Sequence, residues 1–489
     1  MAGNRPLWRW WIALAAGGLA GAALPPWGCP PLLWLALLPL WALGPGPALA
    51  WGAAAVLVSH RWLLWLHPLD WVRVPLPLSL PLCVLLWLAL GLLGALLVSG
   101  WRWVVQRLGA DRLSTACLAA TLWGLAEVLL AKGPLFWIGL GSAVLPGDRA
   151  LAGLAQLVGV GGLAALQLLL SWWLWRWLLN LFSQRSGAGR SALAWLALVL
   201  LLHGWGWWLV LAEQLTAEAA NRSLSLLVLQ PAIPTREKFS WTQQQALMRR
   251  LAAAQAQAEA LGVDALLLPE GALALGELLP RVAAVEVLSG GFRQAGERLH
   301  SSLLRFEPGS ISADQALDKH RLVPLGEWIP APQWLAWSGL SAVGGIDPGQ
   351  PSRLLVRPGG DVGVAICYEL ADGTALAAAS RDGARWLLAS ANLDPYPSQL
   401  QRQFEALAQL RALESSRWLV SAANTGPSLV VNPAGEVLQR LPAGEAGTLA
   451  VRISERSEIT VYGRVGEWPL LLLGLSGGIA RARFKVRQS

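Results

Sequence analysis

Charged side chains are scarce in this sequence. Only 14% of its 489 residues are Asp, Glu, Lys or Arg, whereas 55% are hydrophobic, and the mean hydropathy is +0.46. Soluble globular domains carry about 25% charged residues, so this composition indicates a membrane protein. The 30 tryptophans agree with this interpretation, because indole rings favour the interface between a bilayer and water.

Cysteine and histidine are also few, and their spacing excludes several kinds of site. The four cysteines form no Cys-x-x-Cys pair, which excludes zinc ribbons and thioredoxin-like motifs. The five histidines form no His-Glu-x-x-His motif. We therefore expect neither a metal nor a cofactor. Cys29, Cys83 and Cys117 lie in apolar stretches, where a thiol is usually a small buried hydrophobic group.

The net charge of +8 could indicate nucleic-acid binding, but the distribution of the basic residues argues against it. Residues 1–212 contain four acidic residues, and most of their basic residues lie between apolar spans. This pattern is typical of a polytopic membrane protein, and we expect no nucleic-acid partner. The sequence predicts seven spans near residues 10–24, 30–44, 48–66, 76–99, 113–131, 152–181 and 191–212, and an eighth near 467–480.

The basic residues also predict the orientation of these spans. They gather before the first span and after the fourth, sixth and eighth spans, and the alternate loops hold few of them. With eight spans all four places lie on one side, which the positive-inside rule assigns to the cytoplasm. We therefore expect residues 1–212 to form a membrane domain and residues 213–466 an extracytoplasmic domain. Residues 467–489 would form the last helix and a basic cytoplasmic tail.

Residues 213–466 alternate short apolar strands with long helices, which is typical of a layered α/β domain. Residues 432–436 read as a turn between two strands, and the stretch 279–345 reads as loops that the pattern does not place. The predicted strands are 224–230, 265–269, 362–367, 385–391, 418–423 and 428–432, and the predicted helices are 241–261 and 399–416.

Cys367 is a candidate nucleophile because of its position. It ends the predicted strand 362–367, and side chains at the carboxyl ends of strands face the crevice where α/β active sites gather. It is also the one cysteine of the predicted extracytoplasmic segment, where a structural cysteine would normally have a disulfide partner. The alternative is a buried, inert thiol.

Two other residues could work with such a thiol. Glu270 ends the predicted strand 265–269 and could serve as its base, although a glutamate in this position is usually only solvated. Lys319 is one of only four lysines, and a chain that otherwise uses arginine could keep lysine where a compact ammonium is needed. Codon bias would produce the same scarcity.

These three residues, in this order, resemble the Glu–Lys–Cys triad of the nitrilase superfamily. Their contexts are Leu-Leu-Pro-Glu270-Gly, Asp-Lys319-His-Arg-Leu-Val-Pro-Leu-Gly-Glu327 and Ala-Ile-Cys367-Tyr368-Glu369. The second phrase, together with the spans, is similar to the membrane-anchored branch of the superfamily, the apolipoprotein N-acyltransferases. The resemblance covers nearly the whole chain and implies about eight membrane helices plus an αββα sandwich domain.

The resemblance also implies a two-step reaction. Glu270 would take the proton of Cys367, and the thiolate would attack the acyl ester of a phospholipid, while Lys319 and the Tyr368 backbone N–H stabilise the oxyanion. The amine of an apolipoprotein's N-terminal diacylglyceryl-cysteine would then take the acyl chain from the thioester. Glu327 would support Lys319 or the amine, and its alternative is a solvated loop carboxylate. Tyr368 and Glu369 would shape the pocket, and we expect a monomer.

A few positions stand outside this scheme. Phe239, His320 and residues 392–396 differ from the residues usual in the family, which affects the lid and the acyl pocket rather than the triad. Glu127 lies within a predicted span, where a carboxylate is often functional, although a structural pair with Lys132 would explain it equally well.

Two other functions remain open from the sequence. A membrane-tethered amidase would share the triad and differ in its substrate. A transporter or lipid-binding scaffold with an inactive domain would not need Cys367.

Overall fold

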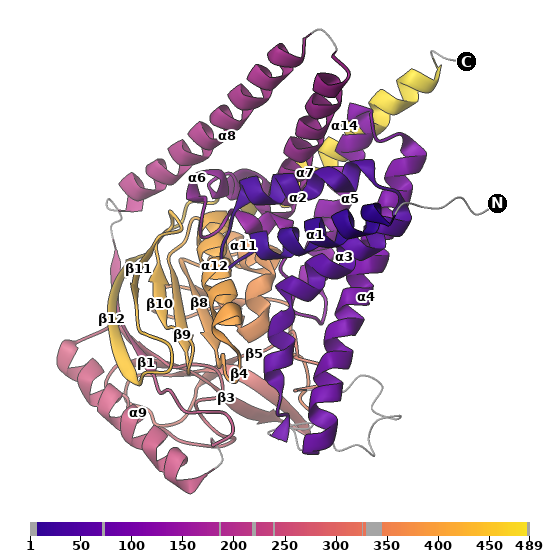
Figure 1. Ribbon diagram of the computed structural model, residues 1–489. Coiled ribbons are helices and arrows are strands. Elements are labelled where there is room, and N and C mark those ends of the chain that lie inside the picture. Colours follow the sequence, from indigo (N-terminus) through magenta and orange to yellow (C-terminus); the bar gives the residue numbers. More distant parts are fainter. Residues whose placement is uncertain are drawn as a thin grey trace.

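The computed structural model describes residues 7–70, 74–184, 187–217, 222–237, 240–324, 326–328 and 345–486. It has two parts, a bundle of apolar helices and an α/β domain that lies against one end of the bundle (Figure 1). The main helices of the bundle are α1 (Trp8–Ala23), α2 (Pro30–Ala42), α3 (Pro45–Ser59), α4 (Leu76–Leu108), α5 (Leu113–Lys132), α7 (Ala155–Phe182), α8 (Ala188–Ala217) and α14 (Trp468–Val486).

Each predicted span coincides with a helix, with shifted ends. The third span ends earlier than expected, because α3 stops at Ser59 and a 3₁₀ turn, η1 (Arg61–Leu66), follows. The fourth is longer, because α4 continues to Leu108. By length and composition, α4, α5, α7 and α8 could each cross a membrane, and α2 and α3 are shorter apolar helices. The count of eight membrane-crossing helices stays a prediction.

Small residues let the helices pack closely. A Cβ atom built on Gly17 of α1 would lie 2.1 Å from the Trp51 carbonyl oxygen of α3, and one on Gly52 would lie 2.4 Å from the Gly94 carbonyl oxygen of α4. Such close backbone contacts are the usual way for helices to associate in lipid, where apolar burial gives no driving force.

The turns that are rich in arginine gather at one end of the bundle. Arg481 of α14 donates to the Leu108 carbonyl oxygen over 2.5 Å, and Trp172 of α7 donates to the Ala110 carbonyl oxygen over 2.7 Å. These contacts place the α4–α5 turn beside the C-terminal helix. Figure 1 shows this end, with the last turns of α7 and the first turns of α8, pointing away from the α/β domain. Which side of a membrane this end faces stays a prediction.

The α/β domain contains two six-stranded sheets. In each sheet three central strands run parallel, and antiparallel strands flank them. The first sheet has the order β12 (Gly447–Ser454), β1 (Ser223–Gln230), β2 (Ala265–Leu267), β3 (Glu286–Ala295), β4 (Arg298–Phe306), β5 (Gln315–Asp318). The second has the order β11 (Val437–Arg440), β10 (Leu429–Val431), β9 (Leu419–Ala423), β8 (Trp386–Ala391), β7 (Val362–Ile366), β6 (Leu354–Leu355).

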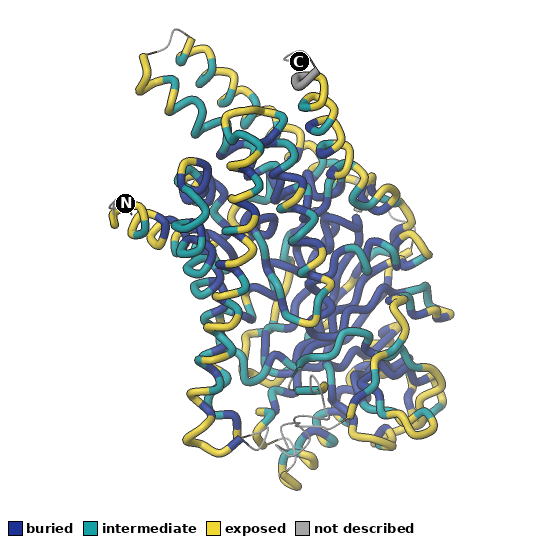
Figure 2. Tube along the Cα trace, turned by 90° about the vertical axis from the view of Figure 1, so that its right-hand side faces the viewer, coloured by how far each residue is buried: buried dark blue, intermediate teal, exposed yellow. Residues whose placement is uncertain are grey.

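Successive side chains of a strand point to opposite faces of its sheet, and this alternation produces the layers of the domain. Leu226 and Val228 of β1 join the core between the two sheets, whereas Leu227 and Leu229 join a core under helix α9 (Trp241–Leu261). On the second sheet, helix α12 (Ser398–Ser415) covers the outer face. Figure 2 shows the buried residues concentrated in this domain and the exposed ones on the outward sides of the helices. The predicted αββα sandwich is therefore correct.

The second sheet's outer helix also joins the domain to the bundle. Helix α7 is kinked at Gly159, whose φ is +62°, and the backbone N–H of Val160 there donates to Glu414 of α12 over 2.9 Å. A Cβ atom on Gly159 would lie 2.3 Å from the ring of Tyr462. The kink, the buried carboxylate and the tyrosine together fix the domain on α7.

The stretch 279–345 differs from the sequence-based expectation. The pattern predicts unplaced loops, but β3 and β4 form a long hairpin there. Gly290 and Gly291 interrupt the apolar alternation of β3 and hide the strand signal. A Cβ atom on Gly290 would lie 2.4 Å from the Cα atom of Glu270, so glycine there allows the backbone of Glu270 to approach.

We expect Gly159→Ala to destabilise the protein by about 1–3 kcal/mol, because alanine is strained at a positive φ and its methyl group would clash with Tyr462. The measurement is the midpoint of thermal unfolding of the purified protein in detergent. Gly204→Ala is the matched control, since Gly204 lies inside α8 and a Cβ atom added there would have no heavy atom within 4 Å. Equal midpoints for the two variants would contradict the role of the kink.

Candidate active site

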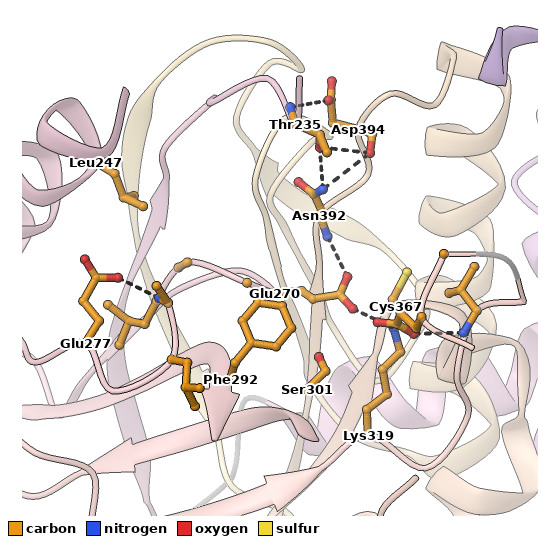
Figure 3. Close-up of a pocket in the computed structure, with 18 of the residues that line it drawn as sticks. Thr235, Leu247, Glu270, Glu277, Phe292, Ser301, Lys319, Cys367, Asn392 and Asp394 are labelled. Carbon is orange, nitrogen blue, oxygen red and sulfur yellow. Dashed lines mark hydrogen bonds and ion pairs between the residues drawn. The ribbon is translucent and has the colours of Figure 1, made fainter. Parts of the chain in front are cut away.

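The structure brings Glu270, Lys319 and Cys367 together from the ends of three strands. Glu270 follows β2, Lys319 follows β5, and Cys367 follows β7, so the two sheets each contribute to the site. Figure 3 shows the side chains of Glu270 and Lys319 converging beside Cys367. All three residues line one cavity of about 500 Å³, together with Glu327.

The ammonium group of Lys319 is the centre of this arrangement. Its Nζ atom lies 2.7 Å from Glu270 Oε1 and 2.8 Å from Glu327 Oε1, and its side chain is 1% exposed. Burial works to lower the pKa of Lys319, but the two carboxylates outweigh it and hold the pKa well above its usual value. Lys319 therefore remains charged and can stabilise a further negative charge that develops in the cavity.

Glu327 is fixed on both of its oxygens. Oε1 accepts from Lys319, and Oε2 accepts the backbone N–H of Val323 over 2.8 Å. Burial raises the pKa of this carboxyl, and Lys319 opposes the shift. The geometry fits a residue that orients Lys319 and does not fit a solvated loop carboxylate.

Glu270 is oriented by a polar chain that starts at Asn392. The backbone N–H of Asn392 donates to Glu270 Oε2 over 3.2 Å. The Asn392 side chain in turn donates to Thr235 Oγ1 over 2.8 Å and accepts from Asn424 over 2.6 Å. These contacts aim the Glu270 carboxylate between Lys319 and Cys367 (Figure 3).

Cys367 has a strained backbone. It is the first residue of the 3₁₀ turn η5 (Cys367–Ala371), and its φ is +53° although it carries a side chain. Such a conformation costs about 1–3 kcal/mol and is common at functional sites. Burial, and next the charge of Glu270, raise the pKa of its thiol well above the usual value. The resting thiol is therefore neutral and needs a base when it reacts, and Glu270 lies beside it.

Glu369 connects the backbone segments that carry the other site residues. Its carboxylate accepts the N–H groups of Ile366 over 2.9 Å and His320 over 2.7 Å. Ile366 precedes Cys367, and His320 follows Lys319. One buried carboxylate therefore holds the backbone beside Cys367 and the backbone beside Lys319. The family difference at His320 leaves this backbone contact in place.

Arg353 is a site residue that the sequence alone did not reveal. Its Nη1 atom lies 2.9 Å from each oxygen of Glu369, and its Nη2 atom donates to the carbonyl oxygen of Asp318 over 2.9 Å. The residue is 3% exposed. Arg353 belongs to no motif. It lies just before β6, the short strand that pairs with the strand of the nucleophile, and this position gives no sequence signal.

Tyr368 lines a second cavity, and Tyr396 lines both this cavity and the catalytic one. The hydroxyl of Tyr368 lies 3.2 Å from that of Tyr396, and the Tyr368 ring contacts Phe136 at 5.2 Å between centroids. Tyr396 belongs to the segment 392–396, where the sequence differs from the family. Phe239, the other difference in this region, lies outside the described residues.

Glu127 has a structural environment of its own. It accepts from Trp123 Nε1 over 2.8 Å and from the backbone N–H groups of Leu140 and Gly141 over 2.7 and 3.3 Å. Of the two interpretations left open, the pair with Lys132 is not found among the ion pairs of the described residues, but the contacts of Glu127 are structural. Glu127 instead fixes the start of the 3₁₀ turn η3 (Leu140–Val144) against α5.

Within the described part of the chain, no group of three His, Cys, Asp or Glu residues could hold a metal ion. The groups in the cavity that can carry chemistry include the Cys367 thiol, the Lys319 ammonium and the carboxylates of Glu270 and Glu327.

Comparison with known proteins shows the family of this chain. The carbon-nitrogen hydrolase family model matches residues 203–460. A curated apolipoprotein N-acyltransferase from Prochlorococcus marinus (strain MIT 9313) is 48% identical over 97% of this chain and 96% of its own. One from Parasynechococcus marenigrum is 46% identical over 94% and 97%, and one from Thermosynechococcus vestitus 34% identical over 97% and 96%. The chain belongs to the apolipoprotein N-acyltransferase family.

Solved structures of the nitrilase superfamily match about half of this chain. Saccharomyces cerevisiae Nit3, a member of that superfamily, is 16% identical and covers 48% of this chain and 91% of its own, with a TM-score of 0.37. The NitN amidase from Neterenkonia sp. AN1 is 18% identical over 51% and 98%, also with a TM-score of 0.37.

In this member of the acyltransferase family, we expect Glu270→Gln to move the pH midpoint for alkylation of Cys367 downward. The change removes a negative charge that raises the pKa of the thiol, while the Lys319 charge that lowers it remains. The same variant should lose acyl transfer by about 10²–10⁴-fold, because the base is gone. Alkylation by iodoacetamide, followed by mass spectrometry across pH, gives the midpoint. An unchanged or raised midpoint would contradict the proposed coupling.

We expect Arg353→Gln to slow acyl transfer more than Arg353→Lys does. Glutamine leaves the buried Glu369 without its charged partner, whereas lysine keeps the charge and loses the bidentate geometry. The measurement is kcat, with the unfolding midpoint recorded beside it. If the two variants lost kcat only in proportion to lost stability, Arg353 would be a fold residue and not a positioning residue.

Proposed function

We propose that this protein transfers a fatty acyl chain from a phospholipid to the N-terminal diacylglyceryl-cysteine of apolipoproteins, through a thioester on Cys367. The observation that carries the proposal is an apolar cavity that adjoins the catalytic cavity. It has a volume of about 420 Å³ and lies between the α/β domain and the helices.

This second cavity suits an acyl chain. One wall comes from η1 and α4, including Trp62, Leu86 and Leu90, and the opposite wall comes from the domain. The two cavities share Val323, Gly326 and Tyr396 in their linings. A chain that lies along α4 would therefore bring its ester group to the edge of the catalytic cavity. A soluble amidase would have no use for an apolar wall supplied by membrane helices.

In the first step, Glu270 takes the proton of the Cys367 thiol, and the sulfur attacks the ester carbonyl carbon. The Lys319 ammonium and the Tyr368 backbone N–H stabilise the oxyanion. When the intermediate collapses, the bond to the glycerol oxygen breaks, and Glu270 returns its proton to that oxygen. Lysophospholipid leaves, and the acyl chain remains on sulfur as a thioester.

In the second step, the α-amine of the diacylglyceryl-cysteine attacks the thioester carbonyl carbon. Glu270 accepts a proton from the amine, and the thiol is released with that proton. Cys367 is 6% exposed, which limits hydrolysis of the thioester by water. Since both substrates are lipids, a domain fixed to membrane helices holds the site where they lie.

The proposal includes a location. The arginine-rich end of the bundle would face the cytoplasm, and the α/β domain would lie outside it, at the bacterial inner membrane. Both termini would then be cytoplasmic, and the enzyme would act as a monomer on lipoproteins after their export.

The test is mass spectrometry of the full-length protein in detergent with a diacyl phospholipid, beside Cys367→Ala. We expect wild type to gain one acyl mass on the Cys367 peptide and to lose it when a diacylglyceryl-cysteine peptide is added. Cys367→Ala should show neither change, because the nucleophile is absent.

Two outcomes would overturn the proposal. If wild type gained no adduct but hydrolysed a small amide, a membrane-tethered amidase would be the better description. If wild type did neither while its unfolding midpoint showed an intact fold, a lipid-binding scaffold would replace both enzymes.

A further inference from the structure

Arg236 is a second cation in the catalytic cavity. Among the described residues that line this cavity, Lys319 and Arg236 carry a positive charge. Lys319 is committed to Glu270 and Glu327. Arg236 follows Thr235, which is one hydrogen-bonded residue, Asn392, away from Glu270. A guanidinium thus stands near the site with no part in the acyl-transfer steps.

The contacts of Arg236 reach from the domain to the helical bundle. Its Nε atom lies 3.1 Å from Asp70 Oδ1, and its Nη2 atom donates to the Pro68 carbonyl oxygen over 2.9 Å. The side chains of the pair are 38% and 60% exposed. Exposed pairs of this kind contribute about 0–1 kcal/mol, so another anion could replace Asp70 at little cost. Guanidinium and phosphate form a matching bidentate pair.

The pair of Arg236 and Asp70 lies next to residues that line the apolar cavity. Leu69, which precedes Asp70, and Val74 line the wall of that cavity, whereas Arg236 lines the catalytic cavity. The loop 67–70 therefore marks a boundary between an apolar space and a charged rim. A glycerophospholipid has the same order along its length, with acyl chains, ester carbonyl and then phosphate.

We propose that Arg236 binds the phosphate of the donor lipid and that Asp70 occupies the guanidinium when no donor is bound. With the acyl chain along α4 and the ester at Cys367, the headgroup would extend past Asn392 and Thr235 toward Arg236. The leaving lysophospholipid would carry this contact with it. The inference rests on the proposed function and adds to it the group that recognises the headgroup.

The experiment measures the donor KM and kcat of the full-length protein in detergent, with a diacyl phospholipid and with the diacylglycerol of the same chains, which lacks the phosphate. Wild type should prefer the phospholipid. Arg236→Gln should raise the phospholipid KM roughly tenfold, the size expected for a lost charge-assisted contact. It should leave the diacylglycerol KM and the acceptor KM unchanged.

Two comparisons separate recognition from a structural role. Asp70→Asn should lower the phospholipid KM, because it removes a competing anion, whereas a merely structural pair would make both variants fail alike. Arg281→Gln is the matched control, since Arg281 pairs with Glu259 at 3.4 Å, is similarly exposed, and lies outside the residues that line the cavity. It should change neither KM.

Each result decides the inference. A KM that rises equally for both donors in Arg236→Gln would show that the residue only shapes the cavity, and would overturn it. Glycerol 3-phosphate, the same phosphate without chains, should compete with the phospholipid in wild type and not in Arg236→Gln. If glycerol 3-phosphate bound as tightly as the phospholipid, a free phosphate ester and not a lipid headgroup would be the ligand. Failure of both donors to acylate wild-type Cys367 would instead count against the proposed function.

Discussion

The buried charge of Lys319 is the constraint on which the rest of the site depends. An ammonium group without access to water is costly unless opposite charges and hydrogen bonds surround it, and removal of one partner from such a pair typically costs about 3–5 kcal/mol. Glu270 and Glu327 supply those charges at 2.7 and 2.8 Å. The same two carboxylates leave the cluster with one net negative charge, which favours a neutral thiol at Cys367. The need for a general base thus follows from the way in which the lysine is stabilised.

This cluster works only if two sheets keep their relative position. Lys319 and Glu270 come from the first sheet and Cys367 from the second, and the sandwich between them is held mainly by apolar side chains, which fix no single register. Glu369 and Arg353 add directional contacts. They join the peptides beside Cys367 to those beside Lys319 through hydrogen bonds that tolerate little displacement. Polar groups buried here therefore contribute geometry more than stability.

Much of this arrangement could be predicted from the sequence, for reasons that also explain the failures. The strands that end at Glu270 and beside Cys367 are short apolar runs, so their signal is local, and their carboxyl ends indicate a crevice. Strands β3 and β4 were not predicted, because Gly290 and Gly291 remove the alternation of side chains that indicates a strand. Gly290 is also the residue that makes room for Glu270. The contacts of Arg353 and Arg236 could not be predicted, because their ion-pair partners are 16 and 166 residues away and no local sequence pattern indicates such contacts.

The helices contribute to the site and not only to its anchoring. In a soluble sandwich of this kind the outer face of α12 would meet water, but here Ala406, Leu410 and Leu413 pack with residues of α7 in one buried cluster. The apolar cavity is likewise half bundle and half domain, with α4 on one side and Tyr368 and Tyr396 on the other. Neither half encloses that space alone. Under the proposed function, the position of α4 along the domain would therefore determine where a lipid ester can lie relative to Cys367. The kink at Gly159 fixes α12 on α7 and so fixes the domain relative to the helices. The kink and the catalytic cluster therefore both contribute to the geometry of the site.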